Sequence, residues 1–537
     1  MEDKNQNPYQ PLYYAIIFAI GLLIGWKLSG TSNLQFMVSG NYEKGSQKIN
    51  QLLNYIEQEY VDTISRKRLA EDALVAILQN LDPHSAYIPA SEVQAMNEPM
   101  QGNFEGIGIE FNLLKDTIMV VSVIAGGPSE SLGIKAGDRI VSIEKKSVAG
   151  IKIKNEDVLK KLRGKGGTKV EIGIFRRGYS KILNYTIIRG KIPIYSIESS
   201  YMLSPTTGYI RISRFASTTY DEFIEASDKL LSSGMHRLVL DLRGNPGGYL
   251  STAISICDEF LTDGQRIVYT LGKSHPKEEF IAKRKGGLEN IELSVIIDEG
   301  SASASEIVSG AIQDNDRGVI IGRRSFGKGL VQQQSDFSDG SALRLTIARY
   351  YTPTGRCIQK PYEKGDLEAY YNEENNRFKH GELVNADSIH FADSLKFKTP
   401  KGKIVYGGGG IMPDIFVPID TSMRSEFIIN LWVKGTVNQF AINYCDKERG
   451  KLKQFSDYKQ FYNAFKGDEK LYGSFLKFAE SEKIKAPSSK ERELSKKFIM
   501  QQLTALIARN LWRGEGYYWV MNQNDPAVQK AMGDLGE

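Results

Sequence analysis

The sequence has few of the residues that hold disulfides or metal ions. Its 537 residues include only three cysteines and five histidines. Cys257, Cys357 and Cys445 form no CxxC pair and are odd in number, which argues against a disulfide framework and against a structural zinc site. The histidines form no HExxH motif and no pair at metal-ligand spacing. We therefore expect chemistry without a metal or another cofactor.

A strong charge imbalance is also absent. The chain has 69 basic and 64 acidic side chains, a net charge of +5. Residues 421–537 contain 19 basic and 14 acidic side chains, so this stretch carries the whole excess. The excess is spread along the stretch, as on a solvated surface, and no nucleic-acid-binding module accompanies it. We therefore expect no nucleic-acid partner.

The longest notable apolar run is too short for an ordinary membrane span. Tyr13 to Trp26 is uncharged for 14 residues and is closed by Lys27, whereas a spanning helix needs about 20 apolar residues. A run of this length near an N-terminus is typical of an export signal, although a buried core helix is the alternative. No small-x-small cleavage site follows cleanly. We expect residues 1–30 to be retained as a membrane anchor, or else cleaved after export.

Hydrophobic spacing divides the remaining chain into four segments. Apolar residues first recur at helical spacing, then in short runs typical of strands, then in alternating strands and helices that indicate an α/β layered domain. Helical spacing returns near the end. The segments are a helical segment (42–103), a β-rich region (104–190), a core region (191–424, with a polar insertion at 361–404) and a helical region (425–537). The last of these keeps Trp432, Trp512 and Trp519, so we expect a folded helical domain that packs on the core region or forms an oligomer contact. An independent helical bundle on a linker is the alternative.

A serine lies at one predicted strand-to-helix junction of the core region. The apolar strand ending at Ile297 leads into a Gly/Ser/Ala turn, and a helix is predicted to begin near Ser303. Ser303 and Glu306 fit a helix capping box, which is a purely structural role. A helix N-terminus also offers unpaired N–H groups that can stabilise an oxyanion. Taken alone, the segment leaves both interpretations open.

A lysine lies in a second glycine-rich turn, where Lys328 stands between Gly327 and Gly329 after an apolar strand. A buried lysine with a lowered pKa can serve as the base for a serine nucleophile, and a surface lysine is the simpler alternative. The pattern from Gly322 to Lys328 also resembles a nucleotide-binding P-loop. That pattern requires Ser or Thr after the lysine and a helix next, whereas the sequence has Gly329 and a predicted strand.

Two further glycine-rich turns offer backbone N–H groups. The loop from Gly244 to Gly248 follows a predicted strand and can supply an oxyanion donor, although a plain turn is the common alternative. The run Gly106, Ile107, Gly108 and Ile109 can bind the terminal carboxylate of a peptide while the next strand pairs with that peptide.

Taken together, these segments resemble the carboxyl-terminal processing peptidases, or tail-specific proteases, of serine peptidase family S41. Seven matching pieces occur in the family's order between about residues 45 and 420. They are Leu81–Ser85; Gly106–Ile109; Gly126–Pro128 with Gly133–Asp138; Asp241–Gly248; Gly300–Glu306; Phe326–Gly329 with Gln332; and Gly407–Gly410 followed by Pro413 and Asp414. The resemblance implies a crotonase- and ClpP-like α/β protease core with a PDZ domain inserted ahead of it.

The resemblance also implies roles for single residues. Ser303 matches the nucleophile, Lys328 the general base 25 positions later, and Gln332 the residue that orients the lysine. The oxyanion donors match the N–H of Ala304 and that of Gly247 or Gly248. Gly106, Ile107, Gly108 and Ile109 match the peptide-binding turn of the PDZ domain.

By the same resemblance, the expected function is cleavage of exported proteins near their C-termini. The partners would be proteins or peptides with apolar C-termini, with the catalytic part in the periplasm, and a homo-oligomer is possible. Two departures are visible: Asp298 stands where the family often has Asn, and the region after about residue 425 matches nothing in the minimal pattern. The alternatives are a catalytically silent PDZ scaffold and, with less support, a nucleotide-binding protein.

Overall fold

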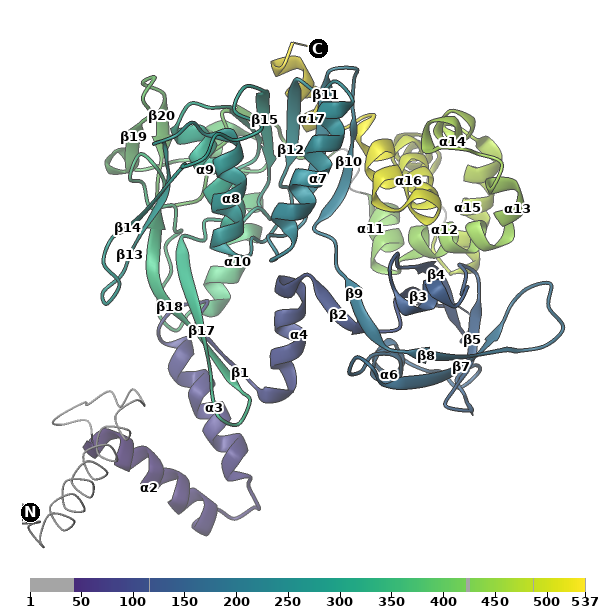
Figure 1. Cartoon of the computed structure of the whole chain (residues 1–537), viewed down its shortest axis with the longest axis horizontal. Coiled ribbons are helices and arrows are strands. Elements are labelled where there is room, and N and C mark those ends of the chain that lie inside the picture. Colours follow the sequence, from purple (N-terminus) through teal and green to yellow (C-terminus); the bar gives the residue numbers. More distant parts are fainter. Residues whose placement is uncertain (1–42, 115, 422–424, 486, 537) are drawn as a thin grey trace, which may run out of the picture. The chain divides into compact units, whose positions relative to one another are not determined.

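The computed structural model describes residues 43–114, 116–421, 425–485 and 487–536 (Figure 1). The expected export segment therefore lies outside the described residues. The chain divides into two compact units, Met1–Ala76 and Ile77–Glu537. Helix α2 (Glu43–Glu59) belongs to the first unit, and α3 (Arg66–Gln79) begins in it. Over the residues that are described, no helix combines the length and the apolar character that crossing a membrane requires.

The core region is built on a six-stranded sheet in the order β10-β11-β12-β15-β16-β21. The first pair is antiparallel and all the other pairs are parallel. The strands are β10 (Ile197–Met202), β11 (Thr207–Ile212), β12 (Arg237–Asp241), β15 (Glu292–Ile297), β16 (Val319–Gly322) and β21 (Ile415–Phe416). The carboxyl ends of β12, β15 and β16 lie at one edge of the sheet, where parallel α/β sheets usually place their ligands.

Both faces of this sheet are covered, because its apolar side chains alternate between two cores. On one face, the buried side chains pack against three helices: α7 (Thr219–Ser232), α8 (Leu250–Phe260) and α9 (Ala304–Asp314). On the other face, Val239, Ile296 and Ile321 pack against α17 (Pro526–Asp534) near the end of the chain. Strand and helix alternation in residues 191–424 thus produces the layered α/β fold that the sequence predicts.

A second sheet contributes side chains to the same apolar core as α7, α8 and α9. Its order is β1-β18-β13-β14, and β17 pairs with β18. The strands are β1 (Ala86–Ile88), β13 (Arg266–Leu271), β14 (Glu278–Ile281), β17 (Leu330–Asp336) and β18 (Ala342–Tyr351). Because β1 pairs with β18, residues of the preceding helical segment are held beside the core region.

The β-rich region begins and ends with two strands that pair antiparallel with each other, β2 (Asn103–Gly106) and β9 (Gly190–Pro193). Between them, the sheet order is β3-β4-β5-β7-β8, with β6 beside β5. The elements are α4 (Ala90–Gln101) before it, then β3 (Ile109–Leu113), β4 (Ile118–Val123), α5 (Pro128–Ser131), β5 (Arg139–Ile143), β6 (Lys146–Ser147), α6 (Asn155–Leu162), β7 (Lys169–Phe175) and β8 (Leu183–Ile188). A separate apolar core fills this region.

The polar insertion expected at 361–404 contains one main helix, α10 (Leu367–Lys379), with strands β19 (Lys396–Lys398) and β20 (Ile404–Tyr406). Tyr370 and Arg377 of this helix are buried. The Arg377 guanidinium donates to the carbonyl oxygens of Ser325 at 3.1 Å and Arg324 at 2.9 Å. The helix therefore supports the turn that contains Lys328.

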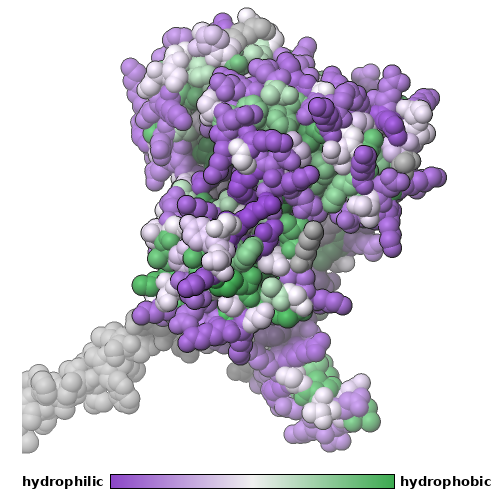
Figure 2. Space-filling view, turned by 90° about the vertical axis from the view of Figure 1, so that its right-hand side faces the viewer, coloured by the Kyte–Doolittle hydropathy of each residue, from purple (hydrophilic) through white to green (hydrophobic). Residues whose placement is uncertain are grey.

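The helical region has its own apolar core and is folded, as its apolar spacing predicts. Its helices are α11 (Glu426–Val433), α12 (Thr436–Lys447), α13 (Arg449–Leu452), α14 (Tyr458–Phe465), α15 (Glu469–Ser481) and α16 (Ser489–Asn522), followed by α17. The face seen in Figure 2 is mostly hydrophilic, and its hydrophobic residues form small, separate groups. Through α17, this region also packs on the core region.

Candidate active site

Three loops meet at the carboxyl ends of β12, β15 and β16, and hydrogen bonds join them. The Asp298 carboxylate accepts from the N–H of Gly244 at 2.8 Å and from that of Gly300 at 3.0 Å. The Ala302 N–H donates to the Asn245 carbonyl at 2.9 Å. Asp298, the departure from the family pattern, thus ties the loop after β12 to the turn after β15. Burial raises the pKa of this carboxyl above its ordinary value.

Ser303 occupies a strained position immediately before α9, with φ 56° and ψ −112°. A side-chain-bearing residue in such a region costs on the order of 1–3 kcal/mol, and such strain clusters at functional sites. The expected capping box is present, and in it the Glu306 carboxylate accepts from the Ser303 N–H at 2.7 Å. The Glu306 N–H also donates to the Ser303 main-chain carbonyl at 2.9 Å. The Ser303 hydroxyl donates its proton to no residue that the structure describes, so that proton is available for transfer.

Glu306 does more than the capping box predicts. Its buried carboxylate also accepts from the Ser325 hydroxyl at 2.6 Å, from the Gly327 N–H at 2.7 Å and from the Lys328 N–H at 2.9 Å. Burial raises its pKa to about 7, and these hydrogen bonds act in the opposite direction. One carboxylate thus fixes the backbone of both Ser303 and Lys328. The sequence gives no sign of this second role, because 19 to 22 residues separate Glu306 from these donors.

Lys328 is half-buried and is oriented by Gln332. Its ammonium nitrogen Nζ donates to Gln332 Oε1 at 3.0 Å. Burial lowers the pKa of Lys328, and the nearby Arg344 cation acts in the same direction, while Glu306 and Asp82 oppose the shift. A lowered pKa increases the neutral fraction of the amine, which is the form able to accept a proton.

A tyrosine connects the backbone of the two residues. The Tyr350 hydroxyl is within hydrogen-bonding distance of the carbonyl oxygens of Ser303, at 3.1 Å, and of Lys328. Tyr350 is itself buried on β18, and burial raises its pKa well above the ordinary value, so its hydroxyl keeps its proton. The structure therefore holds the backbones of Ser303 and Lys328 close together, and Lys328 bonds to Gln332. Among the described residues, the Ser303 hydroxyl and the Lys328 amine form no hydrogen bond with each other.

A turn far away in the sequence holds Gln332 in place. The Gln332 amide donates to the His84 carbonyl. Asp82 stabilises this turn by accepting from the His84 N–H at 2.8 Å and from the Ser85 hydroxyl at 2.6 Å. The same carboxylate accepts from the Thr346 hydroxyl of β18 at 3.0 Å. The Leu81–Ser85 piece was visible as a motif, but its role in orienting Gln332 depends on a contact across 248 positions.

The His84 ring takes no direct part in this arrangement. Its Nε2 atom pairs with the Tyr370 hydroxyl of α10 at 2.9 Å. Burial lowers the pKa of His84 to about 4, and the charge of Lys328 adds to the effect. The ring is therefore neutral at neutral pH, and it packs edge-on against Tyr370.

The loop after β12 lies directly against Ser303. A Cβ atom added to Gly247 would lie 2.7 Å from the Ser303 Cβ and 2.9 Å from the Ala304 nitrogen, so only glycine fits there. The Gly247 N–H is occupied, because it donates to Asn245 Oδ1 at 2.9 Å. The N–H groups of Gly248 and Ala304 donate to no residue in the described part of the chain. These two groups remain available to an incoming oxygen atom.

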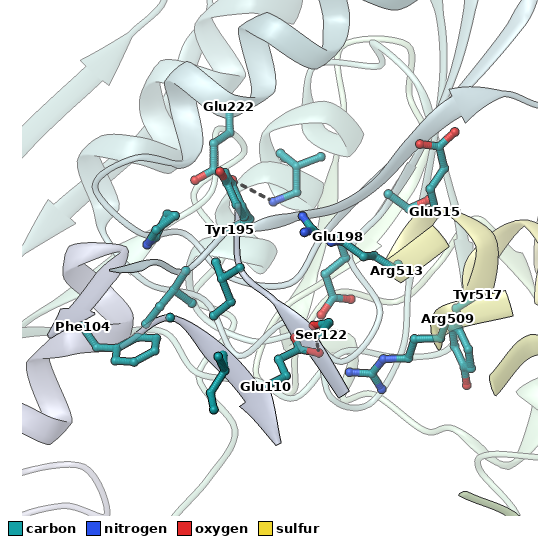
Figure 3. Close-up of a pocket in the computed structure, with 18 of the residues that line it drawn as sticks. Phe104, Glu110, Ser122, Tyr195, Glu198, Glu222, Arg509, Arg513, Glu515 and Tyr517 are labelled. Carbon is teal, nitrogen blue, oxygen red and sulfur yellow. Dashed lines mark hydrogen bonds between the residues drawn. The ribbon is translucent and has the colours of Figure 1, made fainter. Parts of the chain in front are cut away.

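The turn from Gly106 to Ile109 leads into the first residue of β3, which is an edge strand of its sheet. The N–H groups of Ile107 and Gly108 donate to no described residue. A cavity of about 1010 Å³ extends over this turn (Figure 3). The apolar side chains of Leu159 and Leu162 from α6 are part of its lining. An edge strand, free N–H groups and an apolar lining are the features that capture an extended peptide with a terminal carboxylate. Ser303 and Lys328 do not line this cavity.

The arrangement does not favour the nucleotide-binding alternative. Gly329 leads directly into strand β17 at Leu330, whereas a P-loop needs the N-terminus of a helix at that point. No group of three or more potential metal-ligating side chains occurs among the described residues.

The sequence matches three family profiles in separate parts of the chain. Peptidase family S41 matches residues 206–368, and the PDZ domain family matches residues 106–187. A family of unknown function, DUF8443, matches residues 427–514, within the helical region.

Two curated bacterial proteins are similar to this chain. A carboxy-terminal-processing protease from Bartonella bacilliformis is 36% identical over 352 residues, which cover 65% of this chain and 79% of that protein. The carboxy-terminal processing protease CtpB from Bacillus subtilis is 36% identical over 321 residues, which cover 59% of this chain and 66% of that protein.

Among solved structures, the photosystem II D1 C-terminal processing protease is 29% identical to this chain. The match covers 59% of this chain and 85% of that one, with a TM-score of 0.34. The family profiles and the extent of the Bartonella match establish the relationship. The chain belongs to peptidase family S41, with the carboxy-terminal processing serine proteases, and carries a PDZ domain in its β-rich region.

Proposed function

We propose that this chain is a serine endopeptidase that cleaves exported proteins near their C-termini with a Ser303–Lys328 dyad. Neutral Lys328 accepts the Ser303 hydroxyl proton as the oxygen attacks the peptide carbonyl. The N–H groups of Gly248 and Ala304 stabilise the oxyanion, and the lysine then gives its proton to the departing amine. Water hydrolyses the acyl-enzyme by the same route in reverse.

One observation carries this proposal: the Glu306 carboxylate holds the backbone of Ser303 and of Lys328 at once, at 2.7 and 2.9 Å. The strained φ of Ser303 and the lowered pKa of Lys328 support the same assignment. Gly248 is preferred to Gly247 as a donor because the Gly247 N–H already has a partner. A silent PDZ scaffold would have no need of these features.

We assign substrate selection to the turn from Gly106 to Ile109. The free N–H groups of Ile107 and Gly108 are suited to a carboxylate, and Leu159 and Leu162 to an apolar last side chain. A tail bound there adds a strand to the open edge of β3. We further propose that the segment 13–26 directs export and anchors the chain at the membrane of the cell envelope.

Incubation with an unfolded protein that ends in an apolar residue tests the proposed function. Mass spectrometry of the products should show internal cleavage near the C-terminus, with no requirement for nucleotide or metal. The same protein incubated with the Ser303→Ala enzyme should stay intact. A chain that binds this substrate without cutting it would instead be a scaffold.

Amidation of the substrate C-terminus is expected to weaken binding. The amide removes the negative charge that the N–H groups of Ile107 and Gly108 would meet, and hydrogen bonds to charged groups contribute about 1.5–3 kcal/mol, roughly 10- to 150-fold in Kd. Fluorescence anisotropy with a pair of otherwise identical peptides measures the difference. Equal affinity of the acid and the amide would contradict the proposed binding mode.

The pH dependence of cleavage is expected to report Lys328. Because only the neutral amine accepts a proton, kcat/KM should rise with pH through the pKa of Lys328, which burial places below the ordinary lysine value of 10.5. Gln332→Glu puts a negative charge beside the ammonium group, raises its pKa and should move this limb to higher pH. Gln333→Glu is the matched control, because this neighbouring side chain is exposed. If the pH dependence of kcat/KM is the same in Gln332→Glu as in the parent enzyme, Lys328 is not the base.

A further inference from the structure

One wall of the cavity beside the β-rich region comes from residues outside the PDZ match, which covers residues 106–187. Besides β3 and α6, the cavity is lined by Arg509, residues 512–515 and residues 517–518 of α16, in the helical region (Figure 3). The chain that follows the core region thus returns to the turn where a substrate tail is proposed to bind. This inference rests on that proposed binding mode.

A break in helix α16 determines where the cavity-lining residues of this helix lie. Trp512 and Arg513 depart from helical geometry, and Arg513 has a positive φ of 56°. The following Gly514 lies so close to β10 that an added Cβ would be 2.1 Å from the Glu198 carbonyl oxygen. The Arg513 guanidinium donates to the Val123 carbonyl of β4 at 2.9 Å. Because Val123 pairs with Ile109 in the sheet, the break is fastened directly beside the proposed carboxylate-binding turn.

A second contact holds the two regions together. Arg139 of β5 forms an ion pair with Asp446 of α12 at 2.8 Å. The helical region is therefore joined to the β-rich region through Arg513 of α16 and through Asp446 of α12.

Arg509 is a basic side chain of this wall. Burial raises the pKa of the neighbouring Tyr517 hydroxyl, and the positive charge of Arg509 opposes that rise. Arg509 is exposed, and it forms no hydrogen bond or ion pair with any residue described by the structure. Figure 3 shows it pointing toward Glu110 and Ser122. The Glu110 carboxylate accepts from the Ser122 hydroxyl at 2.9 Å, and Glu515 accepts from the Tyr458 hydroxyl at 2.9 Å.

The alternation of side chains along a strand identifies which part of a tail would meet Arg509. A tail that pairs antiparallel with β3 directs its last side chain to the face of Ile109, toward α6. Its penultimate side chain then lies on the opposite face, with Glu110. Arg509 approaches that face from α16.

We propose that Arg509 selects protein tails with an acidic penultimate residue ahead of an apolar last residue. The helical region thereby takes part in substrate recognition. The break at Trp512 and Arg513 positions α16 as the second wall of the peptide site. Glu110 on the same face provides the competing outcome, because it would favour a basic penultimate residue.

Binding of three peptides to the full chain carrying Ser303→Ala tests this proposal. The peptides end in a free leucine and differ only in a penultimate Asp, Asn or Lys. The Asp peptide should bind about two- to fivefold more tightly than the Asn peptide, the range of an exposed ion pair, and the advantage should fall as salt increases. Arg509→Glu should reverse the order so that the Lys peptide binds best. Arg492→Glu, an exposed arginine on the same helix outside the cavity, should leave the order unchanged.

The outcomes separate this inference from the proposed function. Equal binding of the three peptides overturns the role of Arg509, as does an Asp preference that survives Arg509→Glu or tightest binding of the Lys peptide to the parent chain. An amidated Asp peptide completes the set. If the acid and amide forms bind with equal affinity, the proposed carboxylate-binding mode is wrong, regardless of any preference at the penultimate residue.

Discussion

Ser303→Ala and Lys328→Ala are each expected to reduce kcat by about a thousandfold or more while leaving the fold intact, because the two halves of a catalytic pair do not work separately. The double variant should be no worse than either single one. Proteolysis assays on purified variants measure the loss, and circular dichroism measures the fold. Neither substitution removes a large apolar group, so we expect little change in the free energy of unfolding.

Ser309→Ala is the matched control for the serine. Ser309 lies in α9, the helix that begins directly after Ser303. It is buried, and its hydroxyl donates to the Ser305 carbonyl at 2.9 Å. This variant should keep its activity with a stability loss of about 1 kcal/mol. A Lys328→Ala enzyme that is folded and cleaves at a near-normal rate would show that another group is the base.

Loss of α17 is expected to unfold or aggregate the protease core rather than remove a dispensable tail. The helix and the residue after it bury Ala527, Val528 and Leu535 against the face of the sheet that carries Val239 and Ile296. A chain ending at residue 524 exposes that face and also removes Asp525, whose carboxylate pairs with Arg243 at 2.7 Å. Buried aliphatic side chains contribute about 1.5–3 kcal/mol each, so their combined loss is comparable to the whole stability of a domain.

A point variant tests the same contact in a full-length chain. Val528 is 1% exposed, and Val528→Asp puts a charge without a partner into the apolar layer. The expected loss is about 3 kcal/mol or more, which lowers Tm by roughly 6–12 °C in a domain of this size. Gln529→Asp changes the exposed neighbour and should leave Tm nearly unchanged. Equal melting temperatures for the two variants would mean that α17 is not part of the core.

The sequence predicts well those features that are local. Continuous apolar runs predict β12, β15 and β16, and glycine-rich turns follow them. The family resemblance of these turns proposes Ser303, Lys328 and Gln332 for the chemistry. These features follow from spacing along the chain and from motifs of a few residues. The helical character of residues 425–537 is likewise visible as apolar spacing.

What the sequence does not predict depends on contacts between distant residues. Glu306 reads as a capping residue, yet its carboxylate also reaches Lys328. Gly247 and Gly248 are indistinguishable until the Asn245 side chain is seen to occupy one N–H group. Helix α10 reads as part of a polar insertion, although its Arg377 supports the turn before Lys328.

The same holds for the end of the chain. Nothing in the spacing of residues 526–534 shows that they cover the sheet of the core region, or that the break in α16 lies beside the turn of the β-rich region. Such partners are chosen by tertiary packing, which overrides what each segment shows alone.

The most direct test of the account is the site of covalent attachment during turnover. A peptide with an activated p-nitrophenyl ester acylates a serine enzyme quickly, and acid quenching preserves the acyl group. Peptide mapping by mass spectrometry then locates the added mass. The account predicts the acyl group on Ser303, with the burst of p-nitrophenol lost in Lys328→Ala. An acyl group on another residue, or a burst that persists in Ser303→Ala, would contradict it.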